Sequence, residues 1–221
     1  MVGVVIRRAA PAAAALAAAA ALAAPLAARA ASLQAGAACY IEKQPMQLAG
    51  SGFGAQDPIT LTGPQIFASG SADGTGAFTA TIAAPLLGTI SPAAKTFTIT
   101  AADGTSGAST SVDVQVATFT FGTSAGVKAP QARRTWSFSG FLQEPGKPIY
   151  GHFRHAGRTY ANYRFGVPQA PCGTLTVRAP GIPVRRAPAG TWTVQVDFAR
   201  RYSPTSKPRV SSSTSVFRTA G

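Results

Sequence analysis

Glycine and proline recur along the whole of this 221-residue chain, which contains 23 glycines and 17 prolines. Glycine lowers helix stability and proline removes a helix hydrogen bond, so a chain punctuated this often by both cannot form long helices. Between them run short segments that alternate apolar and polar side chains, such as residues 97–100 and 112–116. A period of two is typical of a strand with one buried face. The sequence therefore predicts an all-β protein.

The expected strands fall into two sets. Turn residues such as Asp73-Gly74 and Asp103-Gly104 separate the strands of the first set. Seven short strands in about 85 residues are the pattern of an immunoglobulin-like β-sandwich. The expected strands are residues 40–43, 46–50, 59–62, 65–69, 77–83, 95–101 and 109–121 in the first set and residues 135–141, 148–155, 158–165, 174–178, 191–198 and 213–218 in the second. We therefore expect two tandem immunoglobulin-like β-sandwich domains, residues 31–121 and 132–221, joined by a linker at residues 122–131.

A short internal echo relates the two sets of strands. Gly52-Phe53 leads to Pro58-Ile59 in the first set, and Gly140-Phe141 leads to Pro148-Ile149 in the second. Self-similarity of this kind indicates a duplicated unit.

Residues 40–118 resemble a known family of modules. The segments that carry the resemblance are residues 50–53 (GSGF), 59–62 (ITLT), 71–81 (SADGTGAFTAT) and 98–101 (TITA). They are similar to the bacterial immunoglobulin-like repeats of secreted and surface proteins from GC-rich bacteria. The proline-glycine that usually follows Gly-Phe in these repeats is Gln56-Asp57 here. The resemblance implies a spacer or adhesive module and brings no catalytic residues.

The N-terminus predicts export. Arg7-Arg8 form a short basic region, residues 9–28 form an alanine-rich apolar region, and Ala28-Arg29-Ala30 offers a small-x-small cleavage pattern. We therefore expect residues 1–30 to be a signal peptide and the mature chain to have no transmembrane span. The arginine pair leaves the twin-arginine export route open.

The two cysteines of the chain are Cys39 and Cys172. An even count without metal-ligand spacing, in a chain with an export signal, favours a disulfide between them. Lipidation of Cys39 is the alternative, because Gly36-Ala37-Ala38 places three small residues before it. Gly36 stands where a leucine is usual in lipidated proteins. A disulfide and a lipid anchor exclude each other at Cys39.

Positive charge is confined to the C-terminal half of the chain. Residues 126–221 contain twelve arginines and three lysines against Glu144 and Asp197, a net charge of +13. Residues 31–125 contain two lysines against five acidic residues, a net charge of −3. An anionic partner should therefore meet the C-terminal half.

Arginine grips phosphate or carboxylate groups through two parallel hydrogen bonds and stacks on aromatic rings, which suits an anionic polymer. We expect Glu144 and Asp197 to form salt bridges with some of these arginines. General solubility is the alternative role for the charge. The candidate anion-binding residues are Arg133, Arg134, Arg154, Arg158, Arg164, Arg185, Arg186, Arg200 and Arg201, with Arg178 on a neighbouring strand.

The expected partner is an anionic wall polymer, an acidic glycan or lipid headgroups. The alternative is an extracellular protein–protein module, in which the aromatic residues of the second domain form the contact patch. The aromatic residues that interleave with the arginines are Tyr150, Phe153, Tyr160 and Tyr163. A dedicated nucleic-acid ligand is not expected for an exported chain.

No motif predicts catalysis or a cofactor. Residues 122–126 fit the G-x-S-x-G pattern around Ser124, but Val127-Lys128-Ala129-Pro130 cannot start the helix that a nucleophile elbow needs. His152 and His155 are three apart on an expected strand and so point to opposite faces, which disfavours a shared metal ion. The sequence has no phosphate loop, zinc signature or dinucleotide motif, so we expect a non-enzyme without cofactor or metal.

Overall fold

The computed structural model describes residues 30–124 and 129–217, and all regular structure in these residues is β-strand. The expected all-β fold class is confirmed. The expected signal peptide lies almost wholly outside the described residues. No helix in the described part of the chain is long and apolar enough to cross a bilayer. The chain divides into two compact units, which are described separately below.

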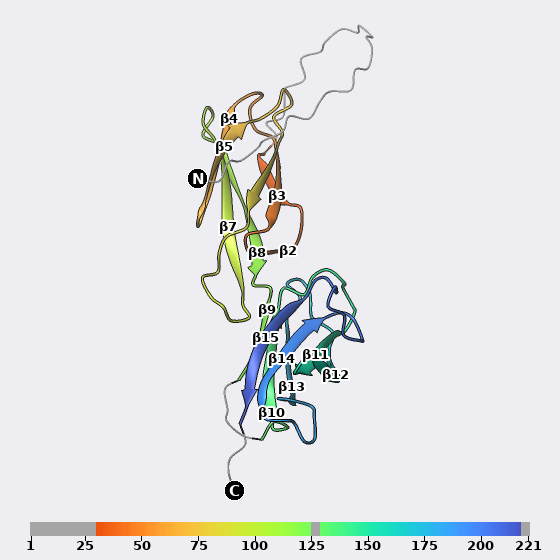
Figure 1. Ribbon diagram of the computed structural model, residues 1–221. Helices are drawn as coiled ribbons and strands as arrows, with labels where there is room; N and C mark the ends of the chain where they lie inside the picture. The colour runs from red at the N-terminus through yellow and green to blue at the C-terminus, as the bar shows by residue number, and fades with distance from the viewer. Residues whose placement is uncertain (1–29, 125–128, 218–221) are drawn as a thin grey trace, which may run out of the picture. The chain divides into compact units, whose positions relative to one another are not determined.

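The first unit holds the described residues up to Leu86 and Thr96–Val116. Two sheets form it, with strand orders β1-β3-β6 and β2-β8-β7-β4-β5. Its largest fully buried side chains, Met46, Leu48, Ile59, Leu61 and Ile99, come from the inward positions of these strands. The strands are β1 (Ser32–Ala35), β2 (Cys39–Ile41), β3 (Pro45–Ser51), β4 (Pro58–Gly63), β5 (Ile66–Ser71), β6 (Phe78–Ala83), β7 (Ala94–Asp103) and β8 (Ser109–Ala117), drawn in red to green in Figure 1.

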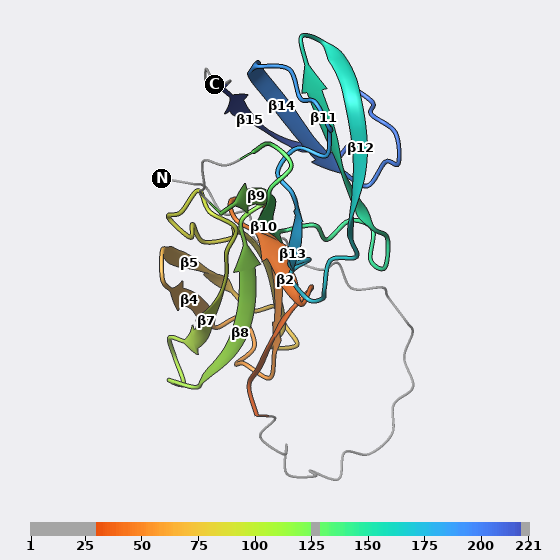
Figure 2. The same cartoon turned by 90° about the horizontal axis from the view of Figure 1, so that it is seen from below.

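The second unit holds Leu87–Lys95 and the described residues from Ala117 on. Its sheets have the orders β13-β10-β9 and β12-β11-β14-β15, and Figure 2 shows β11, β12 and β14 side by side. An aromatic core fills the unit, with Trp136, Phe138, Phe153 and Trp192 among its most buried side chains. The strands are β9 (Thr120–Thr123), β10 (Arg133–Ser139), β11 (Ile149–His155), β12 (Arg158–Gly166), β13 (Leu175–Pro180), β14 (Gly190–Asp197) and β15 (Val210–Val216).

Apart from β2, which only the first unit has among the described residues, both units have the same strand order. In the first unit the chain runs from β3 across to β4 and β5, back to β6, and across again to β7 and β8. Strands β10 to β15 repeat this path in the second unit, and β9 takes the place of β1. This Greek-key path between two packed sheets is that of an immunoglobulin-like sandwich.

The strand prediction was wrong at two places. Strand β1 was not expected, because its four residues, Ser32 to Ala35, are too few to show alternation. The single strand expected at residues 109–121 is two strands in different sheets, since β8 ends at Ala117 and β9 pairs with β10. Strand β9 therefore lies across the expected end of the first domain at residue 121. The division into domains at residues 31–121, 122–131 and 132–221 stays a prediction.

Thr118 explains the break between β8 and β9. Its backbone amide donates to Ala93 O at 3.0 Å, and its hydroxyl accepts from Ala93 N at 3.0 Å. Ser139 Oγ also donates to Ala93 O, at 2.7 Å. These contacts lie within the second unit and hold residues 118 and 139 to the segment Leu87–Lys95.

The Gly-Phe echo forms the same corner in both units. Gly52 and Gly140 follow β3 and β10 with φ angles of 81° and 82°, and the next residue is a buried phenylalanine. The amide of Phe53 donates to Gly76 O at 3.1 Å, and the amide of Phe141 donates to Gly173 O at 3.3 Å. Each unit thus ties the second residue after β3 or β10 to the second residue before β6 or β13.

Only glycine fits at the residue whose carbonyl accepts this hydrogen bond. Gly76 and Gly173 have φ angles of 76° and 58°. A Cβ atom built on them would lie 2.0 Å from Phe53 O and 2.3 Å from Phe141 O, which is closer than any real contact. The left-handed backbone and the close approach both require glycine.

The expected disulfide between Cys39 and Cys172 is confirmed. Both cysteines are disulfide-bonded and buried, and the chain contains no other cysteine. Cys39 begins β2, and Cys172 directly precedes the corner residue Gly173. The thiol of Cys39 is therefore unavailable for lipidation.

The corner predicts a large effect of a small substitution. Gly173→Ala is expected to lower the free energy of unfolding of the second unit by about 1–3 kcal/mol more than Gly146→Ala, the usual cost of overpacking. Gly146 is the matched control, because it has a φ angle of 78° but no atom within 4 Å of an added Cβ. Both tryptophans of the chain, Trp136 and Trp192, lie in the second core, so their fluorescence during urea unfolding reports this unit. Equal losses for the two variants would contradict the steric explanation.

Candidate anion-binding site

The candidate arginines of the second unit form two groups. One group lies on β10, β13 and the segment between β13 and β14, where Arg133 Nη2 donates to Arg178 O at 2.5 Å. Gln131 Nε2 donates to Val184 O at 3.0 Å, which holds the segment that carries Arg185-Arg186 to the start of β10. Apart from Arg134, which is half-buried, these arginines are exposed.

The other group surrounds the four-stranded sheet. Arg154 lies on β11 and is half-buried, Arg158 and Arg164 are exposed on β12, and Arg200-Arg201 are exposed after β14. The guanidinium of Arg154 lies 4.1 Å from the centre of the Tyr202 ring, and that of Arg158 lies 5.5 Å from the Tyr160 ring. Cation–π contacts of this kind orient the guanidinium groups.

The expected pairing of arginines with Glu144 and Asp197 was wrong. Glu144 Oε2 lies 2.5 Å from Lys147 Nζ, and Asp197 Oδ1 lies 3.0 Å from His152 Nε2. Within residues 30–124 and 129–217, no arginine forms an ion pair with a carboxylate. The positive charge of the described arginines is therefore not neutralised by a carboxylate of the protein.

His152 and Asp197 form a buried polar cluster on the sheet β12-β11-β14-β15. Ile149, Phe153, Val194 and Val196 face the core, so the alternating positions that include His152 and Asp197 face the other way. Both side chains are 0% exposed. Register places Asn162 and Gln195 beside His152 on the neighbouring strands.

The hydrogen bonds of His152 indicate an imidazolium. Its Nδ1 lies 2.6 Å from Asn162 Oδ1 and its Nε2 lies 3.0 Å from Asp197 Oδ1, so both nitrogens face acceptor oxygens. Burial alone lowers the pKa of His152, but the hydrogen bonds to Asp197 and Asn162 and the charge of Asp197 outweigh it and raise the pKa above the ordinary 6.5. Below this raised pKa, His152 is protonated and forms an ion pair with Asp197.

Asp197 is held as a carboxylate by several donors. Its Oδ1 accepts from Ala199 N at 2.8 Å, and its Oδ2 accepts from Gln195 Nε2 at 2.7 Å. Burial raises the pKa of Asp197, but the bonds from His152, Gln195 and Ala199 outweigh it and lower the pKa below the ordinary 3.8. A buried charge pair satisfied in this way fixes the geometry of the groups around it.

The pair leaves no group free for proton transfer to a bound substrate. Both nitrogens of His152 are engaged, and the ring is sealed from solvent. His155 lies in a separate environment, where its ring stacks on Trp192 at 5.2 Å and Nδ1 lies 3.0 Å from Thr191 O. Among the described residues, no three histidine, cysteine, aspartate or glutamate side chains are placed to hold a metal ion.

Ser124 is a strand-end residue. It directly follows β9, its amide donates to Thr135 O at 2.8 Å, and its Oγ accepts from Thr135 N at 3.2 Å. These bonds extend the pairing of β9 with β10. Residues 125–128 lie outside the described part of the chain.

The interleaved aromatic residues mostly belong to the core. Phe153 is fully buried, and Tyr163 packs against the same core. Tyr160 is 40% exposed, but it lies at a register shift of β12 and contacts Trp192 at 5.1 Å between ring centres. They therefore do not form one exposed aromatic patch.

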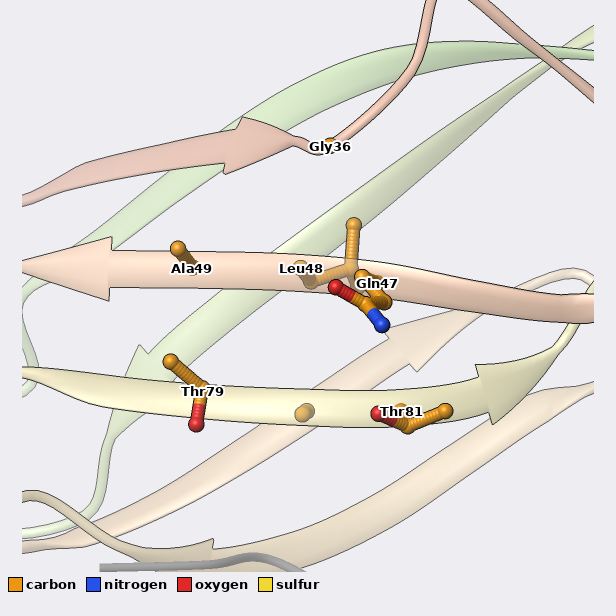
Figure 3. Close-up of a pocket in the computed structure, with 7 residues that line it drawn as sticks. Gly36, Gln47, Leu48, Ala49, Thr79 and Thr81 are labelled. Atoms are coloured by element: carbon orange, nitrogen blue, oxygen red, sulfur yellow. The ribbon is translucent and has the colours of Figure 1, made fainter. Parts of the chain in front are cut away.

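The first unit has a hollow of ≈ 540 Å³ on the sheet β1-β3-β6. Figure 3 shows Gln47, Ala49, Thr79 and Thr81 lining it from β3 and β6. Gly36, Leu48 and Ala80 complete the lining, so the hollow has no titratable side chain. It offers contact and hydrogen bonding but no acid–base chemistry.

Comparisons with known proteins assign this chain to no family. No family model matches the sequence, and no curated protein does. Among solved structures, the chain is similar to Salmonella alpha-2-macroglobulin reacted with methylamine, with a TM-score of 0.31 and 11% identity over 84% of this chain and 14% of that one. A tetra-tandem repeat in the extending region of a large adhesion protein gives a TM-score of 0.29 and 13% identity over 83% of this chain and 47% of that one.

A third similar structure is the YadV chaperone, with a TM-score of 0.27 and 9% identity over 84% of this chain and 99% of that one. The chain spans much less than two thirds of the first structures it resembles. These similarities are too low to carry a functional argument, and the specific bacterial repeat family stays a prediction.

The buried pair predicts how the stability of the second unit depends on pH. The contribution of His152 is complete below pH 6.5 and is lost as the pH rises through its raised pKa. The contribution of Asp197 is complete above pH 3.8 and is lost as the pH falls through its lowered pKa. Urea unfolding followed by tryptophan fluorescence should therefore show the largest free energy of unfolding of the second unit between pH 3.8 and pH 6.5.

Variants test the same pair at fixed pH. At pH 6, Asp197→Asn is expected to cost about 3–5 kcal/mol, because it leaves a buried cation unpaired. Glu144→Gln is the control, since its partner Lys147 is exposed and such a pair contributes at most about 1 kcal/mol. A small loss for Asp197→Asn would contradict the ion-pair assignment.

Proposed function

We propose that this chain is an extracellular, non-catalytic protein whose second unit binds an anionic polymer. The observation that carries the proposal is which cations the two carboxylates of residues 126–221 are bonded to. Glu144 is bonded to Lys147 and Asp197 to His152, so neither neutralises an arginine. The net charge of +13 in residues 126–221 therefore remains available to an external anion.

The surface chemistry supports an anionic polymer as the ligand class. Guanidinium groups are fixed donors that bind phosphate, sulfate or carboxylate through two parallel hydrogen bonds. Each of the two groups of arginines defined above contains exposed guanidinium groups together with further arginines or an aromatic ring. The exposed ones include Arg133, Arg158, Arg164, Arg185 and Arg200. Many separate cations on one unit suit a ligand with repeated anionic groups better than a single small anion.

The disulfide supports an extracellular location. Structural disulfides form and persist in oxidising compartments and are rare where thiols are kept reduced. Cys39 and Cys172 are both buried and bonded, as expected for a structural bridge. The signal peptide predicted at residues 1–30 is consistent with the same location.

The proposal predicts binding that depends on salt. The full chain should bind immobilised heparin at about 0.1 M salt and be released by about 1 M salt, because the screening length falls from about 10 Å to 3 Å. Charge reversal at Arg133, Arg134, Arg185 and Arg186 should weaken binding to heparin wherever the polymer lies, because it greatly lowers the net charge of the unit, and should leave tryptophan fluorescence unchanged. Uncharged dextran resin is the control. Retention that does not respond to salt, or equal retention on dextran, would overturn the proposal.

A further inference from the structure

We propose that the anionic polymer binds on the outer face of the sheet β12-β11-β14, and that the buried His152–Asp197 pair positions the loop that completes this surface. The outer face is defined by Tyr150, His152, Arg154, Asn162, Arg164, Gln195 and Asp197, and the loop by residues 198–209. This inference rests on the proposed function. Beyond the proposed function, it names the arginines that contact the polymer and the buried pair that controls their position.

Sheet register places these side chains next to one another. His152 lies between Asn162 of β12 and Gln195 of β14. One step along the outer face, Tyr150 lies between Arg164 and Asp197. Side chains two apart on a strand share a face, so Arg154 continues this row on β11.

The loop after β14 is attached to the outer face at three points. Ala199 N donates to Asp197 Oδ1 at 2.8 Å, and Gln195 Nε2 donates to Ser203 O at 2.9 Å. Between these anchors, the Tyr202 ring contacts the His152 ring at 6.0 Å between centres and lies against the Arg154 guanidinium at 4.1 Å. The loop therefore folds back over the buried pair.

Arg200 and Arg201 lie between these anchors and are exposed. Their backbone is fixed by bonds that end on Asp197 and Gln195, so the buried pair determines where the two cations stand. Arg154 is held in turn by Tyr202 and by a hydrogen bond from its Nη2 to Gly157 O. Ordering the cations before binding reduces the entropy lost when a ligand binds.

The charges on this surface favour an anion. Its cations are Arg154, Arg164, Arg200, Arg201, Lys207 and Arg209, and the described arginines have no carboxylate partner. Its only carboxylate, Asp197, is 0% exposed and is compensated by the His152 imidazolium. The other titratable groups that face the pair are the phenols of Tyr150 and Tyr202.

A soluble polymer fits this surface better than a lipid bilayer. Membrane-surface binding generally adds exposed apolar side chains to the basic ones. Tyr160, Trp192 and His155 pack together near the other end of β14, where register also places Val216 beside Gly190. The exposed large apolar side chains of the described residues are Phe67, Leu86, Ile90, Tyr160 and Phe217, and none belongs to the outer face or its loop.

Protonation of His152 is linked to this surface through Asp197. When His152 loses its proton, the buried carboxylate of Asp197 is left without a counter-charge, which destabilises the closed position of the loop that covers it. Because the pKa of His152 is raised, the pair is intact at pH 6 and is lost as the pH rises through that pKa. Affinity for a polyanion should therefore decrease in the same range.

The first experiment tests the location with two matched double variants of the full chain. R200S/R201S and R185S/R186S remove the same charge from exposed adjacent pairs. At pH 6, R200S/R201S should weaken binding to heparin by about tenfold or more, whereas R185S/R186S should cost about threefold or less, since only the first removes ordered contacts. Equal losses, or a larger loss for R185S/R186S, would overturn the location.

The same titration with inorganic polyphosphate in place of heparin distinguishes phosphate from sulfate and carboxylate chains. If either polymer shows the expected difference in affinity between the two double variants, the location is supported. Binding to vesicles of anionic phospholipid without binding to either polymer would overturn the choice of a polymer.

The second experiment tests the positioning role. Wild-type affinity for heparin should decrease severalfold between pH 6 and pH 9, and His155→Gln should keep this dependence because His155 is outside the pair. His152→Gln should bind weakly at every pH. The hydrogen-exchange protection of residues 198–203 in the wild type should fall over the same pH range, a measurement that needs no variant.

The outcomes separate this inference from the proposed function. A chain that binds no polyanion at any pH overturns both. A chain that binds but shows no pH dependence in affinity or in loop protection overturns the positioning role alone. If His155→Gln lost the pH dependence of heparin binding, that dependence would come from His155 and not from His152. This result would also overturn the positioning role of His152.

Discussion

A backbone hydrogen bond from a corner phenylalanine closes each sandwich, and in the second unit Gly140 N adds a bond to Cys172 O at 3.0 Å. The amide of Phe53 or Phe141 reaches the carbonyl of a glycine that precedes β6 or β13. The bond turns the chain from one sheet to the other and places the phenylalanine ring in the core. Because the glycine has a left-handed backbone and no room for a Cβ atom, its identity is fixed by geometry.

The second unit adds a polar anchor to this common plan. In the first unit, Asp103 is buried and accepts backbone bonds from Gly54, Thr105 and Ser106, so it fixes turns only. In the second unit, Asp197 at the end of the equivalent strand pairs with His152 and holds a loop that carries two exposed arginines. The same position in the shared strand path thus holds turns in one unit and a loop with two exposed arginines in the other.

Local patterns in the sequence were enough to predict most of the strands, and the disulfide was predicted from two cysteines in a chain with an export signal. Alternation and turn residues depend on neighbours in the chain, so they can be read without knowing the fold. The partner of Asp197 could not be predicted, because His152 is 45 residues away and comes beside it only through the β11–β14 register. The break at Thr118 was missed for the same reason, since its partner Ala93 is 25 residues away.

The second unit is not contiguous in the sequence, because the segment Leu87–Lys95 belongs to it although strands of the first unit precede and follow that segment. A gene fragment that begins at residue 117 would therefore leave Thr118 and Ser139 without their acceptor on Ala93. Neither unit can therefore be excised as one contiguous piece of the sequence.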